Sequence, residues 1–206
     1  MLLSFKRNYP WGGETNFVQK IIQGEKIHTF RIGDRWRPGM FIDFWDESPR
    51  NKWADPKPEW FGVGEPAGAK KWSFHPEKGM MLPMAVSIET WEMRFSRLHE
   101  FWWFTLVIGG VFKWEAIVYQ NVPTGGPEEF MDIAFDKTNY ESISDPCEKL
   151  ETIAKNDGLE LLQFVKWFDH SSREKMLDVI KGQIIHWTDK AYCQETAWKM
   201  DEEIGF

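Results

Sequence analysis

Apolar residues in the N-terminal part of the chain follow first a helical period and then an alternating one. Four of them share one face of a helix that we predict over residues 14–23, with Thr15 as its N-cap and Gly24 just past its end. A strand is predicted next over residues 26–32, and a proline- and glycine-containing turn leads to another over residues 40–45. This part of the chain therefore predicts a helix followed by two strands.

Alternation resumes in the middle of the chain, where a strand is predicted over residues 85–95. Two further strands, over residues 104–108 and 111–119, flank a Gly-Gly pair that has the length and composition of a two-residue hairpin turn. We expect this hairpin at the centre of the sheet. A short strand is predicted over residues 130–135.

The C-terminal part is predicted to be helical until its last strand. One helix opens at Pro146, the next is capped by Asp157 or Gly158, a third occupies residues 171–182, and a strand follows over residues 183–188. The residues expected to face the core are Leu150, Ile153 and Ala154 in the first of these helices and Leu161, Phe164, Val165 and Phe168 in the second.

Residues 46–83 interrupt this order with many prolines and glycines and no apolar period. Such a long loop is uncommon in a compact domain. Disorder is disfavoured because the segment is rich in aromatic residues, which we expect to pack it onto the domain: Trp53, Trp60, Phe61 and Trp72. We interpret the 206 residues as one α+β domain with a Pro/Trp-rich insertion at about 46–83 and a polar tail at about 190–206, in which Trp198 docks.

The formal net charge of −7 sets the expected partners, because such a protein repels polyanions over long distances. A small molecule, or a very short stretch of RNA, fits this charge better than long nucleic acid. The N-terminus lacks the apolar region of a signal peptide, and the longest apolar run is too short to span a bilayer. We therefore expect a cytoplasmic protein without a membrane partner; its oligomeric state is not predicted.

Motifs for several common chemistries are missing from the sequence. It contains no phosphate-binding loop, no zinc-protease motif and no esterase serine motif. Its five histidines are scattered, and Cys147 and Cys193 lie far apart in the sequence with no C-x-x-C motif, so neither a disulfide framework nor a zinc site is indicated and both are expected to be free thiols. No metal and no cofactor is predicted.

The segment from Gly24 to Arg31 concentrates a lysine, a histidine, a threonine and an arginine. Strict alternation would place Lys26 and Thr29 on opposite faces of a strand. If Lys26 lies in the turn before the strand, however, its stem can bend over the sheet and bring its amine toward Thr29 and Arg31. We expect neither Lys26 nor Thr29 to be a core residue, and we expect His28 to pack against the first helix.

This segment, with the Arg35-Trp36-Arg37-Pro38-Gly39 stretch that follows, resembles the G-x-K-x-x-T-x-R opening of ASCH domains. Two later blocks resemble the same family in the same order: residues 153–168 its acidic turn and following helix, and residues 182–189 its closing strand. ASCH domains are small β-barrels of the PUA-like superfamily. The resemblance therefore implies a mixed or antiparallel PUA-like barrel with flanking helices, and it leaves the insertion without a counterpart.

The resemblance also implies an activity. Small bacterial members of the family are amidohydrolases that remove the acetyl group of N4-acetylcytidine with the lysine and threonine of the K-x-x-T motif and an acidic residue. The matching positions here are Lys26, Thr29 and Asp157, although the acid is usually glutamate and aspartate is one methylene shorter. Asp157 fits the role of a helix cap equally well. Arg31, Arg35 and Trp36 are the predicted substrate-binding residues.

The expected function is thus a hydrolase acting on the exocyclic amide of a modified nucleoside or base. Lys26 would serve as the base for the Thr29 hydroxyl, with its pKa lowered by burial and by Arg31. One alternative is a non-catalytic module that binds RNA or a modified base, as many PUA-like barrels do. Another is a regulatory domain whose tryptophan-rich insertion contacts a protein.

Overall fold

The computed structural model describes residues 1–61, 69–97, 101–110, 112–121, 130–134, 146–192 and 198–199. The strands are β1 (Leu2–Phe5), β2 (His28–Ile32), β3 (Asp43–Asp46), β4 (Glu59–Trp60), β5 (Trp72–His75), β6 (Met80–Pro83), β7 (Ser87–Arg97), β8 (Phe101–Ile108), β9 (Phe112–Asn121), β10 (Phe130–Ala134), β11 (Val179–His186) and β12 (Trp198–Lys199). The helices are α1 (Phe17–Ile22), α2 (Pro146–Asn156) and α3 (Leu161–Glu174). The fold is α+β, as predicted.

A long antiparallel sheet has the strand order β10-β9-β8-β7-β11-β2, with β12 paired to β7. The predicted hairpin is confirmed, but its turn is not the predicted two-residue one: Ile108 pairs with Phe112, which leaves three residues between the strands, and Gly109 and Gly110 have φ angles of 63° and 73°. Two positive φ angles in a row suit a turn whose twist matches that of the strands, and glycine adopts them without steric cost.

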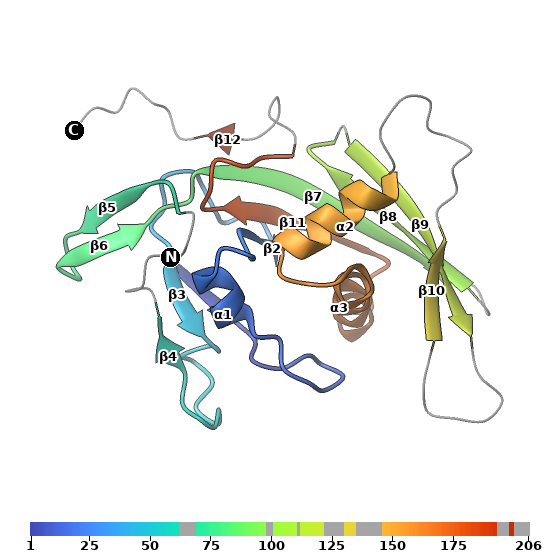
Figure 1. The fold of residues 1–206 in the computed structure, drawn as a ribbon, viewed down its shortest axis with the longest axis horizontal. Coiled ribbons are helices and arrows are strands. Elements are labelled where there is room, and N and C mark those ends of the chain that lie inside the picture. The colour runs from blue at the N-terminus through green and yellow to red at the C-terminus, as the bar shows by residue number, and fades with distance from the viewer. Residues whose placement is uncertain are drawn as a thin grey trace.

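Helices α2 and α3 lie against one side of the long sheet (Figure 1). The predicted core positions are confirmed, because Leu150, Ile153 and Ala154 of α2 are buried and so are Phe164, Val165 and Phe168 of α3, while Leu161 is partly buried. The helical period therefore identified the faces of both helices correctly.

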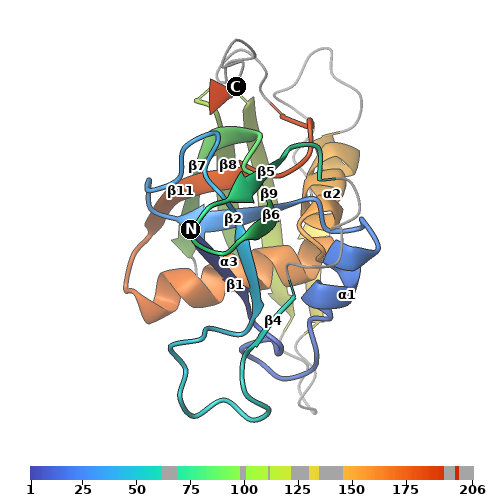
Figure 2. The same ribbon diagram turned by 90° about the vertical axis from the view of Figure 1, so that its left-hand side faces the viewer.

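A smaller sheet, β1-β3-β4, lies beside the long one (Figure 2). Its β1 and β3 strands are parallel, and Phe5 stacks on Phe44 with ring centroids 5.9 Å apart. Phe44 in turn meets Trp187, next to β11, edge to face at 5.2 Å, which joins the small sheet to the core. The described strands form three separate sheets and no closed ring, so the predicted barrel is not confirmed.

The predicted insertion contains ordered structure, including the β5-β6 hairpin that projects from one end of the molecule (Figure 1). Phe61 packs on Phe5 and Phe44, as expected for an aromatic residue that anchors the segment. Trp53 behaves differently: it is 93% exposed, so the prediction that it packs the insertion onto the domain is wrong.

The predicted third helix over residues 171–182 is wrong. Helix α3 continues through the serines to Glu174, because the Ser171 hydroxyl donates to the Trp167 carbonyl inside the helix and does not cap a new one. Residues Val179–His186 instead form β11, which pairs with β7 on one side and β2 on the other. Gly182, predicted to end a helix, lies within this strand.

The predicted start of the first helix is also wrong. Helix α1 begins at Phe17 after Asn16, whose φ of 55° makes it a left-handed N-cap residue. Thr15 is buried, and its hydroxyl donates to the carbonyls of Lys6 and Arg7 instead of capping α1. A long-range contact therefore uses the hydroxyl that the local pattern assigned to a cap.

Candidate functional site

Lys26 lies in the turn between α1 and β2, outside the strand. The chain reverses at Gly24, which has a φ of 77°, and the backbone N–H groups of Glu25 and Lys26 both donate to the Lys20 carbonyl. Strand β2 begins only at His28. The alternation of side chains along a strand therefore does not keep Lys26 and Thr29 on opposite faces. The side chain of Lys26 bends into the protein, where it is 1% exposed.

The amine of Lys26 meets Asp157, which follows α2. Its Nζ lies 2.6 Å from Oδ1 of Asp157 and also donates to the Asp157 backbone carbonyl. The residue that caps α3 is Glu160, which forms a capping box with Gln163, so Asp157 is not the cap of that helix. Gly158 is held close to the lysine stem: a Cβ at this position would lie 3.2 Å from Cβ and Cδ of Lys26.

Burial shifts the protonation of this pair. It lowers the pKa of Lys26 to about 8, while the carboxylate of Asp157 acts in the opposite direction and Arg31 adds to the lowering. Burial also raises the pKa of Asp157, against the influence of Lys26. Two aromatic faces enclose the amine, with Nζ 4.7 Å from the ring centroid of Phe17 and 5.6 Å from that of Phe5.

Lys26, Thr29, Arg31 and Asp157 line one small cavity of about 40 Å³, between β1, β2 and α3. The structure thus brings together the three residues predicted to react and one residue predicted to bind substrate. Thr29 is 5% exposed and Lys26 is fully buried, so the expectation that neither belongs to the core is wrong. Both are polar groups inside the protein, where an unpaired amine or hydroxyl is costly.

Arg31 forms one wall of this cavity. Its Nη2 donates to the Ser4 carbonyl, and its Cζ lies 5.2 Å from the ring centroid of Phe5. Its Nε is buried and has no hydrogen-bond partner among the described residues. Desolvation lowers the pKa of Arg31 to about 10, so the guanidinium remains charged at neutral pH.

The other two predicted binding residues do not line this cavity. Trp36 is 6% exposed and belongs to the core, where its backbone N–H donates to the side chain of Gln183 at 2.8 Å. Arg35 is exposed. Both line a second cavity, which Arg31 lines as well. Their roles in substrate binding remain predictions.

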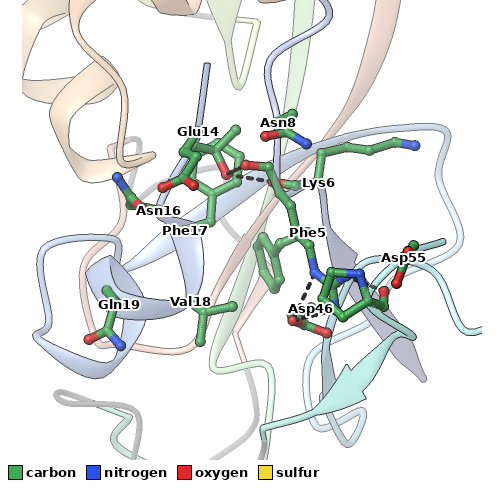
Figure 3. A pocket seen from close by; sticks show the side chains of 13 residues that line it. Phe5, Lys6, Asn8, Glu14, Asn16, Phe17, Val18, Gln19, Asp46 and Asp55 are labelled. Carbon is green, nitrogen blue, oxygen red and sulfur yellow. Dashed lines mark hydrogen bonds and ion pairs between the residues drawn. The ribbon is translucent and has the colours of Figure 1, made fainter. Parts of the chain in front are cut away.

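A wider cleft of about 320 Å³ adjoins the small cavity and shares Phe5, Lys6 and Phe17 with it. Figure 3 shows its lining, which includes the side chains of Phe5 and Phe17. The polar groups around it are mostly carboxamides and carboxylates, together with the cations of Lys6 and Arg7; the carboxamides and carboxylates are Asn8, Glu14, Asn16, Gln19, Asp46 and Asp55. Carboxamides both donate and accept hydrogen bonds, as the edges of nucleobases do.

Sequence reasoning missed a second buried polar cluster, formed where β2, β7 and β11 meet. The side chains of His186 and Glu89 are fully buried, with Nε2 and Oε2 2.7 Å apart. His28 is paired with His186 across the strands and its ring contacts those of His186 and Tyr192, so the prediction that it packs against the first helix is not borne out by these contacts. Burial lowers the pKa of His28 well below its usual value. Only strand register brings these residues together.

Within the described residues, no group of three His, Cys, Asp or Glu side chains is arranged to hold a metal ion. The side chains of Cys147 and Cys193 lie outside the described part, as does that of Trp198, whose backbone forms β12. None of the described helices has the length and apolar character needed to cross a bilayer.

The chain was compared with models of known protein families, with curated proteins and with solved structures, and nothing matched in any of the three. Function can therefore be inferred only from the sequence and from the geometry around Lys26.

Proposed function

We propose that the protein is an ASCH-type, PUA-like hydrolase that cleaves the exocyclic amide of a modified nucleobase or nucleoside, with N4-acetylcytidine as the type of substrate. The observation that supports this proposal is the cavity that Lys26, Thr29 and Asp157 line together, with Lys26 and Asp157 in direct contact. An amine whose pKa is lowered to about 8, a nearby hydroxyl and a carboxylate bonded to the amine are the groups that amide cleavage by a nucleophile needs.

Each residue has a role in this reaction. The Thr29 hydroxyl attacks the acyl carbonyl while Lys26 takes its proton, and Asp157 holds the amine in place and stabilises the ammonium that forms. Arg31, on the cavity wall, stabilises the negative oxygen of the tetrahedral intermediate. The proton on Lys26 passes to the leaving exocyclic amine, and water then hydrolyses the acyl-threonine ester.

The sizes of the two adjoining spaces support a small acyl group. A cavity of about 40 Å³ has little more room than one water molecule occupies in the liquid, so a base is far too large for it, and only the end of a small acyl group would enter it. The base would lie in the wider cleft of Figure 3, against Phe5 and Phe17, with its edge toward the carboxamides.

Substitution of Thr29 tests the proposal. A panel of nucleosides and bases acylated on the exocyclic amine is incubated with the wild-type protein, and release of the free acid is followed by chromatography. Thr29→Val is expected to lower kcat/KM at least about 1000-fold, because the isosteric side chain lacks the nucleophile. Thr188→Val is the matched control, since Thr188 is equally buried but does not line the cavity.

Two results would contradict the hydrolase. One is full turnover by Thr29→Val. The other is binding of an acylated nucleoside that stays intact through prolonged incubation, which would establish a non-catalytic reader of modified bases.

The pH profile gives a second test. Only the neutral amine of Lys26 can accept a proton, and its folded-state pKa of about 8 means that this form is scarce at pH 6 and predominant above pH 9. We expect log kcat/KM to rise with a slope of about one below pH 8 and to level off above it. A rate that is flat between pH 6 and pH 9, measured under conditions where the fold is stable, would exclude Lys26 as the base.

A further inference from the structure

A second cavity, of about 350 Å³, shares the lining residues Arg31 and Ser4 with the small cavity of Lys26. Three arginines from different parts of the chain line it: Arg31 on β2, Arg35 in the turn after β2, and Arg50 in the loop after β3. Two serines, Ser4 and Ser48, also line it, and none of its described lining residues is acidic. Three cationic side chains without a carboxylate are unusual in a protein whose net charge is −7.

The guanidinium groups at this cavity retain free donors. Arg31 uses Nη2 on the Ser4 carbonyl, but its buried Nε has no partner in the described part of the chain. The exposed side chains of Arg35 and Arg50 likewise have no ion pair or hydrogen bond among the described residues. Arg37 differs, because its Nη1 donates to the carbonyls of Asp34 and Trp36, and it does not line the cavity.

Clustered cations repel one another unless an anion joins them. A buried donor such as Nε of Arg31 also costs free energy when it is left unpaired. A carboxylate has only two oxygens, which one guanidinium satisfies. A phosphate has three or four oxygens around a tetrahedral centre, so several guanidiniums can bind it from different directions, and the serine hydroxyls can add further donors.

We infer that the cavity of Arg31, Arg35 and Arg50 binds a phosphate group of a phosphorylated ligand. The site goes beyond the proposed hydrolase activity and does not require it, because phosphate binding uses neither Lys26 nor Thr29 nor Asp157, although it shares Arg31 with the proposed reaction. The phosphate site would nevertheless help to position a phosphorylated substrate for that activity, because Arg31 and Ser4 line both cavities. A nucleotide could then be held by its phosphate in the arginine-lined cavity while its acyl group reaches the small cavity that Arg31 also lines.

Calorimetric titration with inorganic pyrophosphate tests the site directly. We expect the Kd to rise about tenfold in each of Arg35→Gln and Arg50→Gln, and about a hundredfold in the double variant, because each substitution removes a charge-assisted contact from an exposed residue that the fold does not need. Arg94→Gln is the matched control: it makes the same charge change on β7, away from the cavity, and leaves Glu92 paired with Lys181. The control is expected to change Kd less than twofold.

No heat of binding with millimolar pyrophosphate, or equal weakening by Arg94→Gln and by the two cavity variants, would overturn the phosphate site. Pyrophosphate contains no amide, and the titration can be repeated in Thr29→Val. The phosphate site and the hydrolase can therefore fail independently of each other.

The phosphate could belong to a free nucleotide or to RNA. Binding of cytidine, cytidine 5′-monophosphate and an oligocytidylate of five nucleotides distinguishes these two sources. Tighter binding of the monophosphate than of cytidine, lost in Arg35→Gln, identifies a free nucleotide as the ligand. Tight binding of the oligonucleotide alone, with the same dependence on Arg35, identifies an RNA phosphate. Equal affinity of all three ligands in wild type and variants would contradict the site.

Discussion

Lys26→Met is expected to destabilise the protein by about 3–5 kcal/mol, because it leaves the carboxylate of Asp157 buried without its partner. From the sequence alone, which predicted that Lys26 is not a core residue, the free energy of unfolding would be expected to fall by less than about 1 kcal/mol. The structure changes that expectation, because Nζ of Lys26 and Oδ1 of Asp157 are 2.6 Å apart and both side chains are almost completely shielded from solvent. Urea unfolding monitored by tryptophan fluorescence measures the change.

A double variant distinguishes the loss of the whole ion pair from the loss of one partner. Lys26→Met combined with Asp157→Asn removes both charges and keeps a side-chain oxygen that can accept a hydrogen bond from the Phe30 backbone N–H, so stability should return to within about 2 kcal/mol of wild type. Lys20→Met is the control: it makes the same change next to the site, where the Lys20 amine donates to the Gly158 carbonyl and forms no ion pair among the described residues, and it should cost about 1 kcal/mol. A loss below 1 kcal/mol in Lys26→Met would refute the buried ion pair.

Gly182→Ala is expected to lower stability by more than about 4 kcal/mol, or to prevent folding. A Cβ at this position of β11 would lie 1.8 Å from the carbonyl oxygen of Arg31 and 2.9 Å from Cα of Ile32, both backbone atoms of β2. No rotamer relieves that overlap, so the two strands would have to separate. Because β2 carries Thr29 and Arg31, the proposed catalytic cavity and the phosphate site would both be distorted.

The melting temperatures of Gly182→Ala and of the control variant Gly110→Ala are compared by thermal unfolding. Gly110 has a φ of 73° but open space around its Cβ position, so its substitution should cost only about 1 kcal/mol of backbone strain. Similar melting temperatures for the two variants would show that β2 and β11 do not approach as closely as the structure indicates.

Several features of the fold were predictable from the sequence because local patterns determine them. The apolar period identified the buried faces of α2 and α3, and the Gly-Gly pair identified the hairpin between β8 and β9. The same local logic failed where a hydroxyl bonds a carbonyl earlier in the chain instead of capping the helix that follows it. Thr15 bonds to the carbonyls of Lys6 and Arg7, and Ser171 to that of Trp167, so neither residue caps the helix assigned to it.

By itself, then, the sequence determined that the protein is α+β, where most of its strands and its helical faces lie, and which short segment concentrates an amine, a hydroxyl and a guanidinium. Only the tertiary structure decided which of these groups meet. Asp157 reaches Lys26 from 131 residues away, and Arg50 joins Arg31 and Arg35 from the insertion. Periodicity records which face of an element is buried, whereas the partner of a buried polar group depends on how distant elements pack, and no local pattern encodes that packing.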